Sequence, residues 1–105
     1  MNIIIKEHSW RARIAAKQLK GTQAAIVFRN VIYLWGIGKE NFLQNLSWTR
    51  HEVAHVYQYQ HYGFVRFILL YLIETARSGY YNNRFEAEAR GKEEDLKILE
   101  GIKFI

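Results

Sequence analysis

The spacing of hydrophobic and polar positions changes along the chain, and these changes divide it into predicted elements. Between residues 24 and 35, β-branched and aromatic residues form two short runs, AAIVF and VIYLW, separated by Arg29 and Asn30. Runs of this kind on either side of a two-residue turn are typical of a β-hairpin. Asparagine suits such a turn because it tolerates positive φ. We therefore expect a pair of antiparallel strands here.

The other segments are predicted to be helical, each bounded by a polar cap or a glycine. The four helices cover Ser9 to Lys20, the segment 41–61 with Asn45 or Ser47 as its cap, Phe64 to Ser78, and about Asn83 to Glu100. Gly21, Gly63 and Gly79 follow the first three. The last helix is expected to continue through Gly91. The closing GIKFI is expected to form a short strand or a docked tail.

Together these elements predict an α+β fold. The chain has 105 residues, the length of one domain, and half of them are hydrophobic. We expect one mainly helical domain over residues 1–105, with about four helices and a small antiparallel β-sheet before the helix that contains residues 51–55. Helix 64–78 is apolar on almost all sides, so it is expected to be buried or to contact a membrane or a second copy weakly.

Composition narrows the possible chemistry. Cysteine is absent, which excludes disulfides, thiolate metal ligands and a cysteine nucleophile. The start of the chain lacks a signal-peptide core. The longest apolar stretch, residues 64–73, is shorter than the roughly 20 residues that span a bilayer. The sequence therefore predicts a soluble, cytoplasmic protein.

Charge adds a weak signal. The net charge is +5, and Arg11, Arg13, Lys17 and Lys20 lie on one predicted helix. Such a patch is compatible with nucleic acid or anionic lipid. No nucleic-acid-binding motif accompanies it, so a solvated helix face is the simpler interpretation and no nucleic acid is expected as a partner.

The segment HEVAH carries the strongest chemical signal. On a helix, His51 and His55 lie one turn apart on the same face and can share one metal ion. Glu52 is one residue around the helix, so it can reach a water on that metal without ligating it. Zinc in such a site lowers the pKa of the water, and the carboxylate accepts its proton during attack on a peptide carbonyl. Burying two histidines and a glutamate in an otherwise apolar helix also needs a reason.

A catalytic zinc needs a third protein ligand, and the residues leave its identity open. His61 falls where a metzincin has its third histidine, but Gln58 stands in place of the glycine that turns the chain, and the only methionine is Met1. The segment NNRFEAEAR supplies Glu86 and Glu88 instead. These two point about 200° apart on a helix, and geometry alone does not choose between them.

HEVAH followed about 30 residues later by FEAEA resembles the gluzincin metallopeptidases, in particular the soluble single-domain minigluzincins. It is also similar to the catalytic cores of related membrane-embedded peptidases. The resemblance implies a zinc endopeptidase with one Zn²⁺, Glu86 as third ligand and Ala89 as a small packing residue. The family often has Asp after that alanine, where this chain has Arg90.

Several further expectations follow for such a site. Tyr80, Tyr81 and Arg84 are the nearest candidates to stabilise the transition state, although the two tyrosines would also suit packing at a helix corner. A peptide or protein substrate is expected to add to a free strand edge in residues 24–35. The tail 101–105 could fill the cleft and keep the enzyme latent. The alternatives are a zinc-binding domain without activity and a basic nucleic-acid-binding domain in which HEVAH is accidental.

Overall fold

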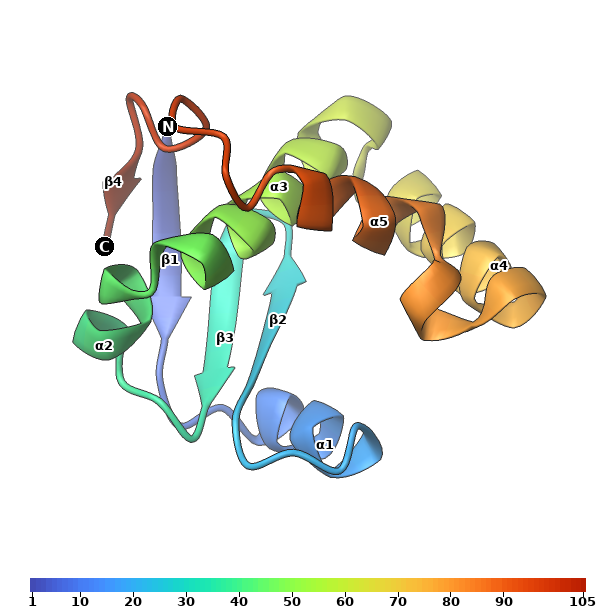
Figure 1. The fold of residues 1–105 in the computed structure, drawn as a ribbon, viewed down its shortest axis with the longest axis horizontal. Coiled ribbons are helices and arrows are strands. Elements are labelled where there is room, and N and C mark those ends of the chain that lie inside the picture. The colour runs from blue at the N-terminus through green and yellow to red at the C-terminus, as the bar shows by residue number, and fades with distance from the viewer.

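A four-stranded mixed sheet forms one layer of the computed structural model, which describes residues 1–105 (Figure 1). The strands are β1 (Asn2–Lys6), β2 (Ala24–Phe28), β3 (Val31–Trp35) and β4 (Lys103–Phe104). Their order in the sheet is β2-β3-β1-β4. The strand β2 pairs antiparallel with β3, whereas β1 is parallel to both β3 and β4.

The α+β class is confirmed, and so is the predicted hairpin. The sheet is larger than expected, and it is mixed and not antiparallel. The difference comes from β1 and β4, which were not predicted to pair within this sheet. Ile3 and Ile5 of β1 alternate into the core, and Ile4 donates its backbone N–H to the Asn30 carbonyl at 2.9 Å. The positive φ of the hairpin turn falls on Arg29, while the Asn30 amide donates to the Asn2 carbonyl at 3.2 Å.

The chain has five helices, one more than predicted. They are α1 (Trp10–Gln18), α2 (Lys39–Gln44), α3 (Leu46–Tyr62), α4 (Phe64–Asn82) and α5 (Arg84–Gly91). The predicted helix 41–61 is divided at Asn45, whose side chain accepts from the Trp48 N–H and caps α3. Ser9 caps α1 as expected. Gly79 has non-helical φ and ψ and kinks α4 near its predicted end.

The last helix ends at Gly91 and does not continue to Glu100 as predicted. The following segment, residues 92–100, forms consecutive turns that fold back onto α3. Arg50 donates to the Glu93 carbonyl at 3.1 Å, and Tyr57 donates to the Ile98 carbonyl at 3.4 Å. These contacts with a distant helix outweigh the local preference for helix in a segment that starts at a glycine.

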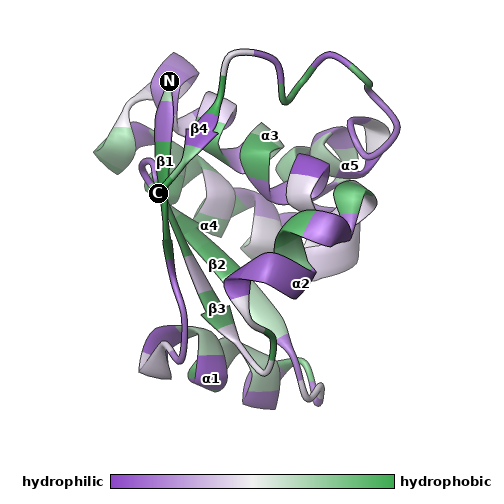
Figure 2. Cartoon of the chain, turned by 90° about the vertical axis from the view of Figure 1, so that its left-hand side faces the viewer, coloured by the Kyte–Doolittle hydropathy of each residue, from purple (hydrophilic) through white to green (hydrophobic).

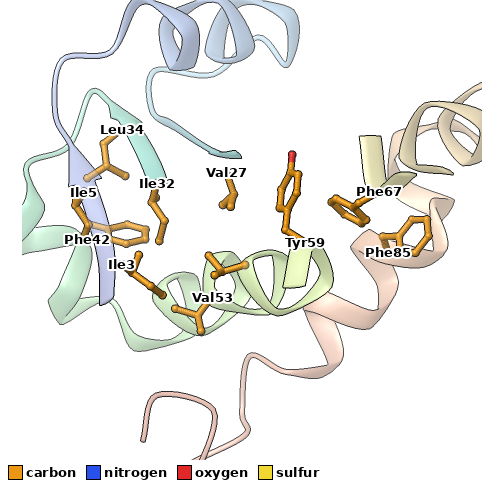
Figure 3. Close-up of a cluster of buried hydrophobic side chains, with 11 residues drawn as sticks. Ile3, Ile5, Val27, Ile32, Leu34, Phe42, Val53, Tyr59, Phe67 and Phe85 are labelled. Carbon is orange, nitrogen blue, oxygen red and sulfur yellow. The ribbon is translucent and has the colours of Figure 1, made fainter. Parts of the chain in front are cut away.

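The core lies between the sheet and α3 and continues under α4 and α5 (Figure 3). Figure 2 shows that hydrophobic residues are concentrated along the strands. Aliphatic side chains of β1, β3 and α3 fill one end. Aromatic rings fill the other, where Phe67 of α4 and Phe85 of α5 meet edge to face with ring centroids 5.1 Å apart. Tyr59 connects the two ends, because its ring lies 4.5 Å from that of Phe67.

The corner between α4 and α5 is fixed by the buried Asn83. Its amide nitrogen donates to the Tyr71 carbonyl at 3.1 Å and to the Thr75 hydroxyl at 2.9 Å. Its oxygen accepts from the Phe85 N–H at 2.8 Å and caps α5. These hydrogen bonds occupy both polar atoms of the buried amide and hold it in place. Asn83 therefore sets the direction in which α5 leaves α4, and with it the direction of the side chains on the first turn of α5.

None of the five helices combines the length and the apolar composition needed to cross a bilayer.

Candidate metal centre

The middle of α3 presents His51 and His55 on one face, as their spacing predicts. Their ring centroids are 5.1 Å apart. His55 is buried, and His51 is only slightly more accessible. Val53 and Val56 face the core from the other side of the helix. The apolar side of α3 therefore holds the helix against the sheet and leaves its polar side turned toward α5.

Glu86 on the first turn of α5 meets both histidines. Its Oε1 lies 3.0 Å from His51 Nε2, and its Oε2 lies 3.1 Å from His55 Nε2. One donor atom from each of the three residues lies within 4.8 Å of the others. Glu88 points away, is exposed, and accepts from the Gln58 amide at 3.0 Å. The arrangement places Glu86, and not Glu88, with the histidines.

Each imidazole is held through its other ring nitrogen. His55 Nδ1 lies 2.7 Å from Gln58 Oε1, and His51 Nδ1 lies 2.8 Å from Glu93 Oε2. Because both partners are acceptors, they favour a proton on Nδ1. Nε2 is then the ring nitrogen that can bind a metal ion or, in the metal-free protein, carry a second proton that it donates to Glu86. The Gln58 amide group also donates to the Phe85 carbonyl at 3.0 Å, which ties α3 to α5.

Electrostatics couple the three residues. Burial alone would raise the pKa of Glu86, but the hydrogen bonds from His51 and His55 hold it well below its ordinary value. Burial opposes protonation of the imidazoles. The hydrogen bond to Glu86 and the charges of Glu52 and Glu86 together outweigh it, with help from Glu93 at His51 and Gln58 at His55. The pKa of His51 therefore rises to about 9, and that of His55 rises as well. A buried carboxylate between two imidazoles thus requires positive charge, either as protons or as a metal ion.

This donor set fits zinc. Two imidazole nitrogens and one carboxylate are the ligands of many catalytic zinc sites, in which a water takes the fourth position. All three donors are held by packed helices, and each histidine has an outer hydrogen-bond partner, as metal-binding histidines usually have.

Glu52 is buried beside this group without being part of it. Burial raises its pKa to about 7, although the two neighbouring histidines act in the opposite direction. A carboxyl group with a pKa near neutrality can take up and release a proton at physiological pH. Glu52 is therefore suited to proton transfer at the edge of the site.

A cavity of about 300 Å³ opens beside Glu52, His55 and Glu86. Its walls are mostly apolar and come from β2, α1, α3 and α4. A second, more open depression lies on the other side of Glu52 and is bordered by His51 and Glu93. Because β2 ends the sheet on this side, it has a free edge for main-chain hydrogen bonds along the cavity.

The three predicted transition-state residues are placed differently. Tyr80 lines both depressions beside Glu52. Tyr81 is exposed, with the Arg90 guanidinium 4.2 Å above its ring. Arg84 is exposed and lies over the Phe85 ring at 4.6 Å. Only Tyr80 therefore lies next to the histidines and Glu86.

Tyr71 was not predicted from the sequence, because its helix carries only an apolar pattern. Its hydroxyl donates to Glu86 Oε2 at 2.5 Å. Burial and the nearby Glu86 carboxylate raise the pKa of both Tyr71 and Tyr80, so both phenols keep their protons and act as donors. The only sequence feature that could have indicated Tyr71 is that it is a polar-tipped residue inside the apolar run LLYLI.

His61 and the C-terminal tail lie outside the site. His61 is exposed near the end of α3, with its ring against Tyr62 at 4.6 Å, and does not approach the other histidines. The tail forms β4 next to β1, at the sheet edge opposite β2. It does not line the cavity and so is not placed to block it.

Comparison with known proteins found no matching family model, no similar curated protein and no similar solved structure.

Proposed function

We propose that this protein is a small zinc-dependent endopeptidase in which His51, His55 and Glu86 bind one Zn²⁺. The observation that carries the proposal is the convergence of these three buried donors next to the buried Glu52, at the wall of a cavity bordered by a free strand edge. A purely structural cluster would need the histidines and Glu86, but not an acid with a pKa near 7 facing an open cavity.

Bound zinc would activate a water and polarise the carbonyl of the scissile peptide bond. Glu52 accepts the proton of the attacking water and passes it to the leaving amine. Tyr80, protonated and beside Glu52, donates to the negative charge that develops on the carbonyl oxygen. Tyr71 holds Glu86 in place through its hydroxyl.

The substrate is an extended peptide or protein segment that adds to the free edge of β2. Ala25 and Ile26 of this strand line the same cavity as His55 and Glu86, so a chain paired with β2 passes the candidate zinc site. Cleavage within a chain, and not at its end, is consistent with a site that is open on two sides of Glu52.

The gluzincin resemblance supports this assignment in two ways. It independently favours Glu86 over Glu88 as third ligand, in agreement with the placement of the two side chains. The acid that the family often has after the small alanine is replaced here by Arg90. In this chain Glu93, three residues later, provides a carboxylate at 2.8 Å from His51.

The test compares the wild type with Glu52→Gln and with Glu94→Gln, a matched change at an exposed neighbour of the site. All three proteins should hold about one zinc per chain after purification without chelator. Peptide cleavage by Glu52→Gln should fall about 10²–10⁴-fold, the usual contribution of a general base. Glu94→Gln should cleave at the wild-type rate.

Other outcomes would replace the proposal. Zinc without any cleavage by the wild type would favour a zinc-binding domain that is latent or inactive. A protein without zinc that binds DNA or RNA through Arg11, Arg13 and Lys17 would favour the basic nucleic-acid-binding alternative.

A further inference from the structure

One face of α4 is apolar and uncovered. Val65, Leu69, Leu72 and Ile73 are each more than half exposed, and Ala76 is exposed as well. Their spacing of three and four residues places them in one stripe along the helix, about 17 Å long. The opposite side of α4 is occupied, because Phe67 packs on Phe85 and Tyr59. Figure 1 shows α4 at the end of the molecule farthest from β4.

One residue of the stripe shares the cavity with the end of α1. Leu72 of α4 and Leu19 at the end of α1 both line that cavity, and both are more than half exposed. The uncovered apolar surface is therefore not a single helix ridge. It is a surface shared by two helices, and we call it the α1–α4 face.

Exposed positively charged residues lie at the borders of the α1–α4 face. Arg66 and Arg77 lie at the two ends of the stripe, and Lys17 and Lys20 flank Leu19. Arg29 lies over the ring of Phe64 at the start of α4, 4.4 Å from its centroid.

Acidic residues are located elsewhere. No Asp or Glu occurs between Glu7 and Glu40, and Glu74 is the only acid in α4. The Glu74 carboxylate accepts from the Arg84 N–H at 3.3 Å, at the start of α5. Six of the ten acidic residues fall in residues 86–100. That segment runs along the side of α3 away from α1 (Figure 1).

We infer that the α1–α4 face docks on an anionic lipid surface. An apolar helix face with basic residues at its borders lies in the plane of the membrane interface, with its aliphatic side chains below the headgroups and its cations among them. No helix here is suited to cross the bilayer, so the contact is peripheral. The inference does not depend on the proposed peptidase activity.

The same features disfavour two other occupants. In an antiparallel two-fold dimer through α4, Arg66 of each copy would lie beside Arg77 of the other, and the stripe offers no acidic residue to pair with them. Single-stranded nucleic acid is bound by aromatic side chains on which bases stack. The exposed stripe is entirely aliphatic.

Docking would determine where the cavity opens. Because Leu19 and Leu72 belong both to the α1–α4 face and to the cavity wall, the mouth of the cavity would lie at the lipid surface. Chain segments that emerge from or lie on the membrane would then reach the free edge of β2 first.

The experiment is co-sedimentation of the full chain with phosphatidylcholine vesicles, with and without phosphatidylglycerol. The variant Val65→Ser/Leu69→Ser removes two exposed residues of the stripe that do not line the cavity. Leu46→Ser/Leu96→Ser is the matched control, because both residues are similarly exposed but lie outside the α1–α4 face. Circular dichroism and thermal unfolding establish that both variants fold.

The wild type should partition to the anionic vesicles and much less to the neutral ones, with binding weakened by salt. Val65→Ser/Leu69→Ser should lower the partition coefficient about tenfold or more, and the control less than twofold. Equal binding to both vesicle types, or an equal loss in the control, would overturn the inference. So would concentration-dependent dimerisation that the stripe variant abolishes in the absence of any vesicle binding. Nucleic-acid binding that is unchanged by the stripe variant, without vesicle binding, would overturn it too.

Discussion

The two histidines of the candidate site are supported in opposite ways. His55 is held from within its own helix, by the buried Gln58 three residues later. His51 is held by Glu93, which lies 42 residues away on a turn segment and keeps about a third of its side chain exposed. One support is neutral, local and buried. The other is charged, distant and partly open to water. The difference separates the part of the site that α3 builds alone from the part that needs the whole chain.

The largest effect should come from Glu86, since it contacts both histidines. Glu86→Ala should lower zinc affinity by much more than about 10–100-fold, which is the usual effect of removing a residue that hydrogen-bonds to a metal ligand. Glu88→Ala, two residues away on the exposed side of α5, should bind zinc within a fewfold of the wild type. Competition with a chromophoric chelator measures both. Equal losses in the two variants would contradict the assignment of Glu86.

Glu93 and Gln58, which hold the two histidines, should differ in their effects on zinc affinity and on stability. Glu93→Gln should lower zinc affinity about 10–100-fold with little change in the unfolding free energy of the metal-free protein, because water can reach that position. Gln58→Ala should lower zinc affinity and also destabilise the metal-free fold by about 1–3 kcal/mol, since the Phe85 carbonyl loses a buried donor.

Chelator competition and urea unfolding separate the two readouts, with Glu94→Gln as the exposed control. If Glu93→Gln proved as destabilising as Gln58→Ala, the distinction between an open and a buried support would be wrong.

A smaller effect should appear in the pH dependence of the metal-free protein. Because the pKa of His51 rises to about 9 in the folded protein, protonation of His51 stabilises the fold. This contribution is complete below the ordinary histidine pKa near 6.5 and is lost as pH rises through 9. The raised pKa of Glu52, about 7, acts in the same direction between about pH 4.5 and 7. Below that range, protonation of Glu86 removes its contribution.

Urea unfolding of chelator-treated protein should therefore give a free energy that falls between pH 5 and pH 9. With zinc present the slope should reverse or flatten, because binding needs deprotonated imidazoles. A metal-free stability that rises over this range would show that the histidines are not paired with Glu86.

The same division between local and distant contacts explains how far the sequence could predict the structure. Spacing within α3 was enough to place His51 and His55 on one face with Glu52 beside them, one residue around the helix. Two short apolar runs around a two-residue turn were enough for the β2–β3 hairpin. Glu86 and Glu88 could not be separated by spacing, because the choice depends on how Asn83 orients α5. Glu93 was hidden inside a segment predicted as continuous helix. The strand β1 was missed because both of its neighbours in the sheet are far away in sequence.

The pairing of β4 with β1 has a consequence for the order of folding. Asn2 lies opposite Lys103 in this parallel pair, so its closure spans nearly the entire chain and carries the largest loop entropy in the molecule. The turn segment with Glu93 is attached to α5 at one end and to β4 at the other. Completion of the sheet and completion of the support of His51 therefore belong to the same late step. In amide hydrogen exchange, β4 and residues 92–100 should open together and before α3.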